Sequence, residues 1–381
     1  MTALTPNAPS SKKPLLTLSG LAGLSPEAYR DLSPQQWPVL DKNVPVERLY
    51  SNGRFSTPDG KANIVPTPYL PPASKTCEDF PLLLNTGRLR DQWHTMTRSG
   101  LSPRLSEHSP EPTVAVNPSD ASTFNLKEGQ LAKVASVQGS VVARLQLNNN
   151  VQSGTVFMPI HWSETFSSMG KTCKLIAPAI DPISGQPEFK ITPVNIHPMN
   201  VASEAMLAVN TAYEDSAIRS DILARLLLCG WTKRHIEGGK LFHLQSPVPK
   251  ADFVSALTTS LSAKYQQSLQ SSINGCTRVV FFSQGELAAA IAVSEGVGQV
   301  EGADISSLFS KDDLDVAAFS SGNGSEAGRI VCACKQVGVR TLTKFMEKNP
   351  GATLSAMSSE TQAGTGCGSC LPELRMLNAN A

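Results

Sequence analysis

The sequence predicts a mixed fold with three parts: a β-rich barrel-like domain, an α+β segment and a small cysteine-bearing domain at the C-terminus. Three observations predict it. Short apolar runs alternate with turn signals from Phe80 to Pro198, apolar residues recur at helical spacing after Met199, and a Gly- and Ser-rich stretch precedes the C-terminal cysteines. The expected divisions are 1–75, 76–200, 201–319, a flexible linker at 320–328, and 329–381.

Composition limits the classes of function. Of 381 residues, 40% are hydrophobic and 17% are charged, which is enough apolar material for cores and too little charge for a disordered chain. The formal net charge of +1 offers no global field to attract nucleic acid or an anionic membrane surface. No run approaches the roughly 18 to 20 apolar residues of a membrane span. We therefore expect a cytoplasmic protein that binds neither nucleic acid nor membrane.

The β-rich domain is expected to begin after the extended connector Leu70–Ser74, whose two prolines disfavour helix. Turn signals such as Asn117-Pro118 and Gln138-Gly139 divide the domain into short strands, with one short helix at 120–126. The expected strands are 82–84, 114–116, 130–137, 141–147 and 155–160.

The rest of the chain mixes helices and strands. Helical spacing predicts helices at 216–228 and 251–269, and the turn Ser283-Gln284-Gly285 predicts a hairpin between strands 278–282 and 286–293. In the C-terminal domain the expected helices are 339–347, 352–359 and 372–377.

Eight cysteines fall into two groups. Four are scattered and are interpreted as ordinary thiols: Cys77, Cys173, Cys229 and Cys276. The other four form two close pairs: Cys332 with Cys334, and Cys367 with Cys370. Four thiolates suit either a tetrahedral zinc ion or a [2Fe–2S] cluster. The second pair is surrounded by glycines, whose backbone N–H groups can approach sulfur, and this favours the cluster.

A second motif is the glycine turn that comes directly after the first apolar strand. Thr86-Gly87-Arg88 offers backbone N–H groups and a planar guanidinium, a combination that can bind pyrophosphate, and His94 and Thr95 add further hydrogen-bonding groups. Taken as chemistry alone, such a turn is more often structural. The corresponding ordinary interpretation of Trp93 is core packing.

The cysteine segments resemble a known family. Ile330-Val331-Cys332-Ala333-Cys334, followed by 364–374 (GTGCGSCLPEL), is similar to the bacterioferritin-associated-ferredoxin type of [2Fe–2S] domain. The resemblance implies a small all-α module in which Cys332, Cys334, Cys367 and Cys370 ligate a cluster that passes electrons.

The glycine turn carries a second resemblance. Residues 86–95 match the segment T-G-R-x-x-x-x-W-H-T of oxidoreductases that bind bis(molybdopterin guanine dinucleotide) with molybdenum, and later segments of that family recur in order. The resemblance implies a six-stranded double-psi barrel that closes over the cofactor. Carried over by position, the cofactor-binding residues are Thr86, Gly87, Arg88, Trp93, His94, Thr95, Trp162 and Lys190.

Together the two motifs resemble the large subunits of assimilatory nitrate reductases, which convert nitrate to nitrite. Because no N-terminal [4Fe–4S] motif or molybdenum domain is visible, we expect the C-terminal portion of such an enzyme, with residues 1–75 a remnant of the preceding catalytic region. The expected partners are those absent domains and an electron-donating reductase, ferredoxin or flavodoxin. No catalytic residue is expected here, and the chain alone is expected to be inactive. The alternative is a non-enzymatic [2Fe–2S] electron-transfer or interaction module.

Overall fold

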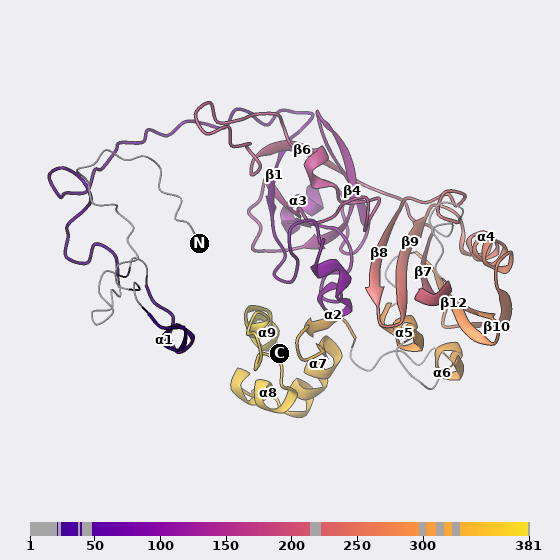
Figure 1. Ribbon diagram of the computed structural model, residues 1–381. Coiled ribbons are helices and arrows are strands. Elements are labelled where there is room, and N and C mark those ends of the chain that lie inside the picture. Colours follow the sequence, from indigo (N-terminus) through magenta and orange to yellow (C-terminus); the bar gives the residue numbers. More distant parts are fainter. Residues whose placement is uncertain are drawn as a thin grey trace. The chain divides into compact units, whose positions relative to one another are not determined.

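The computed structural model describes residues 21, 24–36, 39, 48–213, 222–296, 302–309, 316–321 and 328–379 (Figure 1). The chain divides into two compact units, Met1–Pro71 and Pro72–Ala381. Within the described part of the first unit, one short helix, α1 (Pro26–Arg30), is capped by the side chain of Ser25, which accepts a hydrogen bond from the Ala28 amide at 3.2 Å.

The second unit begins with a closed six-stranded barrel of strand order β1-β5-β2-β4-β3-β6 (Figure 1). Two of its strand pairs, β1 with β5 and β2 with β4, are parallel, and the remaining pairs are antiparallel. Fully buried Leu84, Leu145 and Val156 belong to the core inside it. Its strands are β1 (Leu82–Gly87), β2 (Thr113–Val116), β3 (Leu131–Ser136), β4 (Gly139–Leu147), β5 (Thr155–Pro159) and β6 (Thr192–Pro198).

The sequence predicted five of these strands and missed β6. That segment carries prolines at positions 193 and 198, which argue against a strand when only local sequence is considered. It forms nonetheless because β1 and β3 both pair with it and close the barrel. The predicted short helix is present as α3 (Pro118–Thr123), with Asn117 as its N-cap, and the barrel also carries α2 (Pro103–Ser106).

A six-stranded antiparallel sheet comes next, in the order β10-β11-β12-β7-β9-β8. Helix α4 (Lys250–Ser262) packs on one face through Phe253 and Leu257, while Ile305 and Phe319, from α5 (Gly302–Ser306) and α6 (Val316–Ser321), belong to the core on the other face. Burial on both faces explains why β12 is a nearly continuous apolar run. The strands are β7 (Ser203–Asn210), β8 (Gly230–Ile236), β9 (Gly239–Ser246), β10 (Gln266–Ile273), β11 (Cys276–Ser283) and β12 (Glu286–Glu295).

The predicted hairpin at 283–285 is present between β11 and β12, but two predicted helices need correction. The helix expected at 251–269 ends at Ser262, and residues from Gln266 form β10, because pairing with β11 supplies ladder hydrogen bonds that helical spacing does not reveal. The helix expected at 216–228 lies partly outside the described residues, and its described part, from Ile222, contains no α-helix.

The C-terminal domain combines three helices with a small hairpin, so the expectation of an all-α module is wrong for residues 330–338. Here β13 (Ile330–Cys332) pairs with β14 (Val337–Gly338), because the chain must reverse tightly between the first cysteines and the first helix. The three predicted helices are present as α7 (Val339–Lys348), α8 (Leu354–Thr361) and α9 (Leu371–Ala379). Most of the expected linker, 322–327, lies outside the described residues, and residues 320 and 321 belong to α6.

Among the described residues, no helix combines the length and apolar character needed to cross a membrane.

Candidate cofactor sites

The predicted glycine turn stands at the end of β1, where the barrel packs tightly. Gly87 pairs with Pro159 of the parallel strand β5. A Cβ atom at Gly87 would lie 2.5 Å from the ring of Phe157, so the backbone approaches this ring more closely than any other residue would allow. The end of β1 is therefore held against β5 with no room for a side chain.

Two predicted residues fasten this turn to a distant segment. The Thr86 hydroxyl donates a hydrogen bond to the Phe189 carbonyl at 2.8 Å, and the Lys190 ammonium donates one to the Thr86 carbonyl. Thr86 is buried and Lys190 is exposed. The structure thus brings Thr86 and Lys190 together. Each of the two hydrogen bonds joins a side chain of one segment to a backbone carbonyl of the other.

The loop after the turn carries the other predicted residues on its surface. Arg88, His94 and Thr95 are exposed, Trp93 is 54% exposed, and the rings of Trp93 and His94 meet edge to face at 4.2 Å. The ordinary interpretation of Trp93 as a core residue is therefore wrong.

Trp162, in contrast, is buried. It packs with Met96 and Phe166 beneath the loop. Both His94 and Met96 have positive φ, 39° and 61°, a conformation that costs non-glycine residues energy and that clusters at ligand sites.

His161 organises this loop, and the sequence analysis did not identify it as a site residue. Its ring is fully buried; Nε2 accepts a hydrogen bond from the Leu89 amide at 2.8 Å, and Nδ1 lies 2.5 Å from the His94 carbonyl, to which it donates. Burial lowers the pKa of His161 below its ordinary value, so the ring stays neutral and provides one acceptor and one donor. Its position next to Trp162 is the only signal that the sequence offered.

The second site gathers the four paired cysteines. Sγ of Cys334 lies 3.7 Å from Sγ of Cys332 and 3.7 Å from Sγ of Cys367, and the thiols of Cys332 and Cys370 also interact. Cys332 and Cys370 are buried, whereas Cys334 and Cys367 are exposed. The two pairs, although distant along the chain, therefore meet in one row of sulfurs.

The backbone around these sulfurs suits thiolate ligands. Although burial opposes it, hydrogen bonding by the backbone amides of Gly364 and Lys335 lowers the pKa of Cys332. A Cβ atom at Gly366 would lie 2.8 Å from Sγ of Cys334, so only glycine lets the chain pass so close to the sulfur. Amides facing a sulfur and a glycine-lined approach are features that tune iron–sulfur clusters.

Four thiols in contact match the ligand number of a [2Fe–2S] cluster. In the part of the chain that the structure describes, no three His, Cys, Asp or Glu side chains are arranged to hold a single metal ion. The sulfur contacts and the surrounding amides are the features that fit a cluster.

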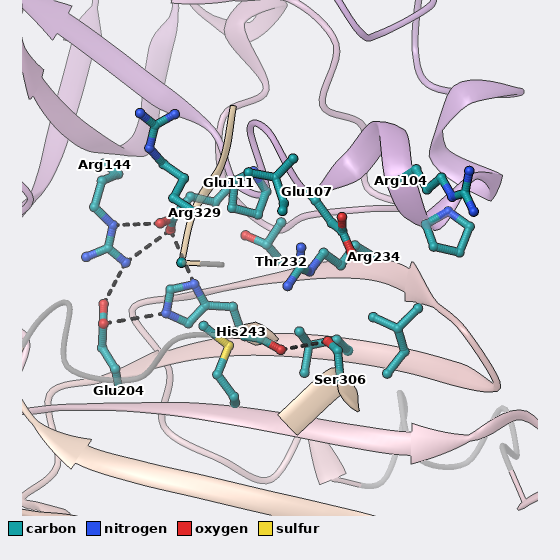
Figure 2. A pocket seen from close by; sticks show the side chains of 18 of the residues that line it. Arg104, Glu107, Glu111, Arg144, Glu204, Thr232, Arg234, His243, Ser306 and Arg329 are labelled. Carbon is teal, nitrogen blue, oxygen red and sulfur yellow. Dashed lines mark hydrogen bonds and ion pairs between the residues drawn. The ribbon is translucent and has the colours of Figure 1, made fainter. Parts of the chain in front are cut away.

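A third feature, which the sequence did not predict, is a cavity of about 1110 Å³ lined by residues of the barrel, the sheet and the C-terminal domain (Figure 2). Arg144 of β4 lines it and donates hydrogen bonds to both carboxylate oxygens of Glu111, at 2.9 and 3.0 Å, and to Glu204 of β7 at 2.6 Å. His243 lies 3.5 Å from both carboxylates. Arg144 is thus paired with both carboxylates, and His243 lies beside them.

Two segments of the chain match known domain families. Residues 82–193 match the family model of the molybdopterin dinucleotide binding domain, and residues 330–377 match that of the BFD-like [2Fe-2S] binding domain. These matches confirm the molybdopterin dinucleotide and the [2Fe–2S] cluster as the cofactors predicted from the sequence.

Three proteins of similar sequence are nitrate reductases. The chain is 31% identical to a nitrate reductase of Klebsiella oxytoca over 95% of its own length, 33% identical to one of Shewanella frigidimarina over 50%, and 32% identical to the assimilatory nitrate reductase catalytic subunit of Bacillus subtilis over 47%. It spans only 40%, 23% and 26% of those proteins, respectively. The chain is thus similar to nitrate reductases, and it contains one segment that matches the molybdopterin dinucleotide binding domain and a second that matches the BFD-like [2Fe–2S] binding domain.

Proposed function

We propose that this chain is the part of an assimilatory nitrate reductase that caps bis(molybdopterin guanine dinucleotide) and relays electrons to it from a [2Fe–2S] cluster. One observation carries the proposal. The loop that continues from the glycine turn contacts the cysteine segments directly, since Arg90 donates hydrogen bonds to the carbonyls of Val331 and Ser369. An electron relay needs its two redox groups within electron-tunnelling distance, and this contact supports such an arrangement.

The roles of the residues are inferred from their positions. Arg88, exposed beside the turn, would bind the pyrophosphate with its planar fork, and Trp93, His94 and Thr95 would contact the nucleotide from the same loop. Thr86 and Lys190 hold the turn in shape, and Trp162 supports the loop from below. When bound, the cofactor supplies the redox chemistry at molybdenum, and the protein supplies binding and orientation. The two parallel strand pairs of the barrel support the double-psi topology.

The rest of the enzyme would come from outside this chain. We propose that the molybdenum and [4Fe–4S] domains correspond to the part of the relatives to which this chain does not align. A reductase, ferredoxin or flavodoxin would donate electrons in the cytoplasm. Because molybdenum must be enclosed on all sides, the chain alone should show no nitrate reduction.

The experiment compares two variants of the chain, reconstituted with the segment of a nitrate reductase relative that it lacks. Arg88→Ala removes charge-assisted hydrogen bonds worth roughly 1.5 to 3 kcal/mol each, so pterin content and nitrate reduction should fall at least tenfold with every electron donor. Cys332→Ser should abolish activity with the protein donor and spare much of it with a small reduced dye that reaches molybdenum directly.

Purified without oxygen, the unsubstituted chain should contain about two iron and two sulfide per molecule, the content of one [2Fe–2S] cluster. Stoichiometric zinc without sulfide would overturn the cluster assignment. Full pterin content in Arg88→Ala would contradict the proposal that Arg88 binds the pyrophosphate at the glycine turn. A chain that holds its cluster but never acquires pterin would be the alternative, a non-enzymatic electron-transfer module.

A further inference from the structure

Arg90 contacts both cysteine segments with one guanidinium group. Its Nη2 donates a hydrogen bond to the Val331 carbonyl at 2.5 Å, and its Nη1 donates one to the Ser369 carbonyl at 3.3 Å. Val331 precedes Cys332, and Ser369 precedes Cys370. The side chain therefore bridges the backbone immediately before one ligand of each cysteine pair.

Acidic residues on both sides hold this guanidinium in place. Asp91 lies 2.9 Å from its Nε, and Glu373 of α9 lies 3.6 Å from Nη1. Although Arg90 as a whole residue is exposed, its side chain keeps only 20% of its surface, and those of Asp91 and Glu373 keep 10% and 19%. An arginine ion pair contributes more when it is partly buried and paired with two carboxylates than when it is fully exposed.

The same network continues through two further residues. His108 bridges Asp91 at 3.2 Å and Glu373 at 3.1 Å, and Arg329 pairs with Glu373 at 2.8 Å. Asp91 and His108 belong to the barrel domain, whereas Arg329 and Glu373 belong to the C-terminal domain. The network is thus an interface between the two domains, and Arg90 is the member that contacts the backbone directly before two of the cysteines.

We propose that Arg90 is a positioning residue that docks the cysteine segments onto the loop beside the pterin site and raises the reduction potential of the cluster. The second effect is a consequence of charge. Reduction adds one electron to the cluster, and a nearby fixed cation stabilises the more negative state. The inference rests on the proposed function in needing the cluster to be present, and it does not require molybdenum or pterin.

The test uses the full chain, purified anaerobically with its cluster, and three variants. Arg90→Gln removes the charge and the fork, Arg90→Lys keeps the charge and removes the fork, and Arg98→Gln changes an exposed arginine of the same loop as the matched control. The readouts are the cluster potential, from a redox titration followed by electron paramagnetic resonance, and the hydrogen exchange of amides in 330–338 and 367–371.

We expect Arg90→Gln to shift the reduction equilibrium about tenfold toward the oxidised cluster, which is about 59 mV for one electron, and to speed amide exchange in both segments. Arg90→Lys should speed exchange while changing the equilibrium by less than about twofold, and Arg98→Gln should change neither. A purely structural contact would shift the potential equally in both Arg90 variants.

Two results would overturn the inference: a potential in Arg90→Gln equal to that of Arg98→Gln, or unchanged exchange in both Arg90 variants. Failure of the proposed function looks different, because the unsubstituted chain would then contain no iron and sulfide to titrate, or would bind cluster yet support no nitrate reduction after reconstitution.

Discussion

His161 shows how much of the loop after the glycine turn depends on one buried side chain. The loop is exposed and contains two residues with positive φ, so it has little core of its own. The imidazole holds the loop together because it accepts a hydrogen bond from the Leu89 amide and donates one to the His94 carbonyl. Its neutral form is required, because a protonated ring could not accept from Leu89.

We expect His161→Phe to lower the free energy of unfolding by about 1–3 kcal/mol at pH 7.5, since both backbone groups lose their partner. The folded-state pKa lies below the unfolded value of about 6.5. The unfolded chain therefore takes up the proton first, and the stability that His161 contributes is lost as the pH falls from about 6.5 through the folded pKa.

Urea unfolding at pH 7.5 and pH 5.5 checks this. The difference between the unsubstituted chain and His161→Phe should shrink at the lower pH, whereas His197→Phe, at an exposed histidine of β6, should stay within about 0.5 kcal/mol of the unsubstituted chain at both. A difference that grows at pH 5.5 would contradict the neutral-ring interpretation.

Among the elements, the parallel pair β1 and β5 positions the glycine turn. Parallel strands run in the same direction, so the loops that continue from both strands leave from one end of the barrel. This brings His161, just after β5, to the loop that continues from β1. The close contact of Gly87 with the Phe157 ring sets how near the two strand ends lie.

Gly87→Ala should therefore destabilise the barrel by about 1–3 kcal/mol, the usual cost of overpacking. Adding Phe157→Leu should recover part of that loss, because the smaller side chain makes room for the methyl group. The measurement is a double-mutant cycle by urea unfolding. If the two substitutions simply add, the close contact does not limit packing at this position.

For the second compact unit as a whole, Arg144 joins the barrel to the sheet (Figure 2). Its side chain is 10% exposed, that of Glu204 is 2% exposed, and the two carboxylates raise its already high pKa although burial opposes them. A cation so placed stays charged throughout the accessible pH range. Removing it would leave Glu111 and Glu204 facing each other across the junction without their central partner.

We expect Arg144→Met to lower the free energy of unfolding by about 3–5 kcal/mol, the cost of leaving buried charges uncompensated. Lys171→Met is the matched control, because Lys171 pairs with the exposed Glu164 and should change stability by no more than about 1 kcal/mol. Equal effects in the two variants, measured by urea unfolding, would show that the Arg144 network does not stabilise the junction.

Patterns within short segments sufficed for much of this protein. Alternation and turn residues predicted five barrel strands and the hairpin at 283–285, and helical spacing predicted the three C-terminal helices. The spacing of Cys332–Cys334 and Cys367–Cys370 predicted a four-thiolate metal site, and the glycines and the family resemblance favoured a [2Fe–2S] cluster over zinc. Each of these depends on periodicity or on ligand spacing along the chain, which is readable without a fold.

Other features depend on pairing between distant segments. Strand β6 forms because β1 and β3 both pair with it. His161 lies 67 positions from its acceptor His94, and Arg90 lies 279 positions from Ser369. Arg144 and Glu204 are likewise separated by 60 positions. Local sequence carries no signal for such contacts, because only the closure of the barrel and the docking of the C-terminal domain bring these groups within hydrogen-bonding distance.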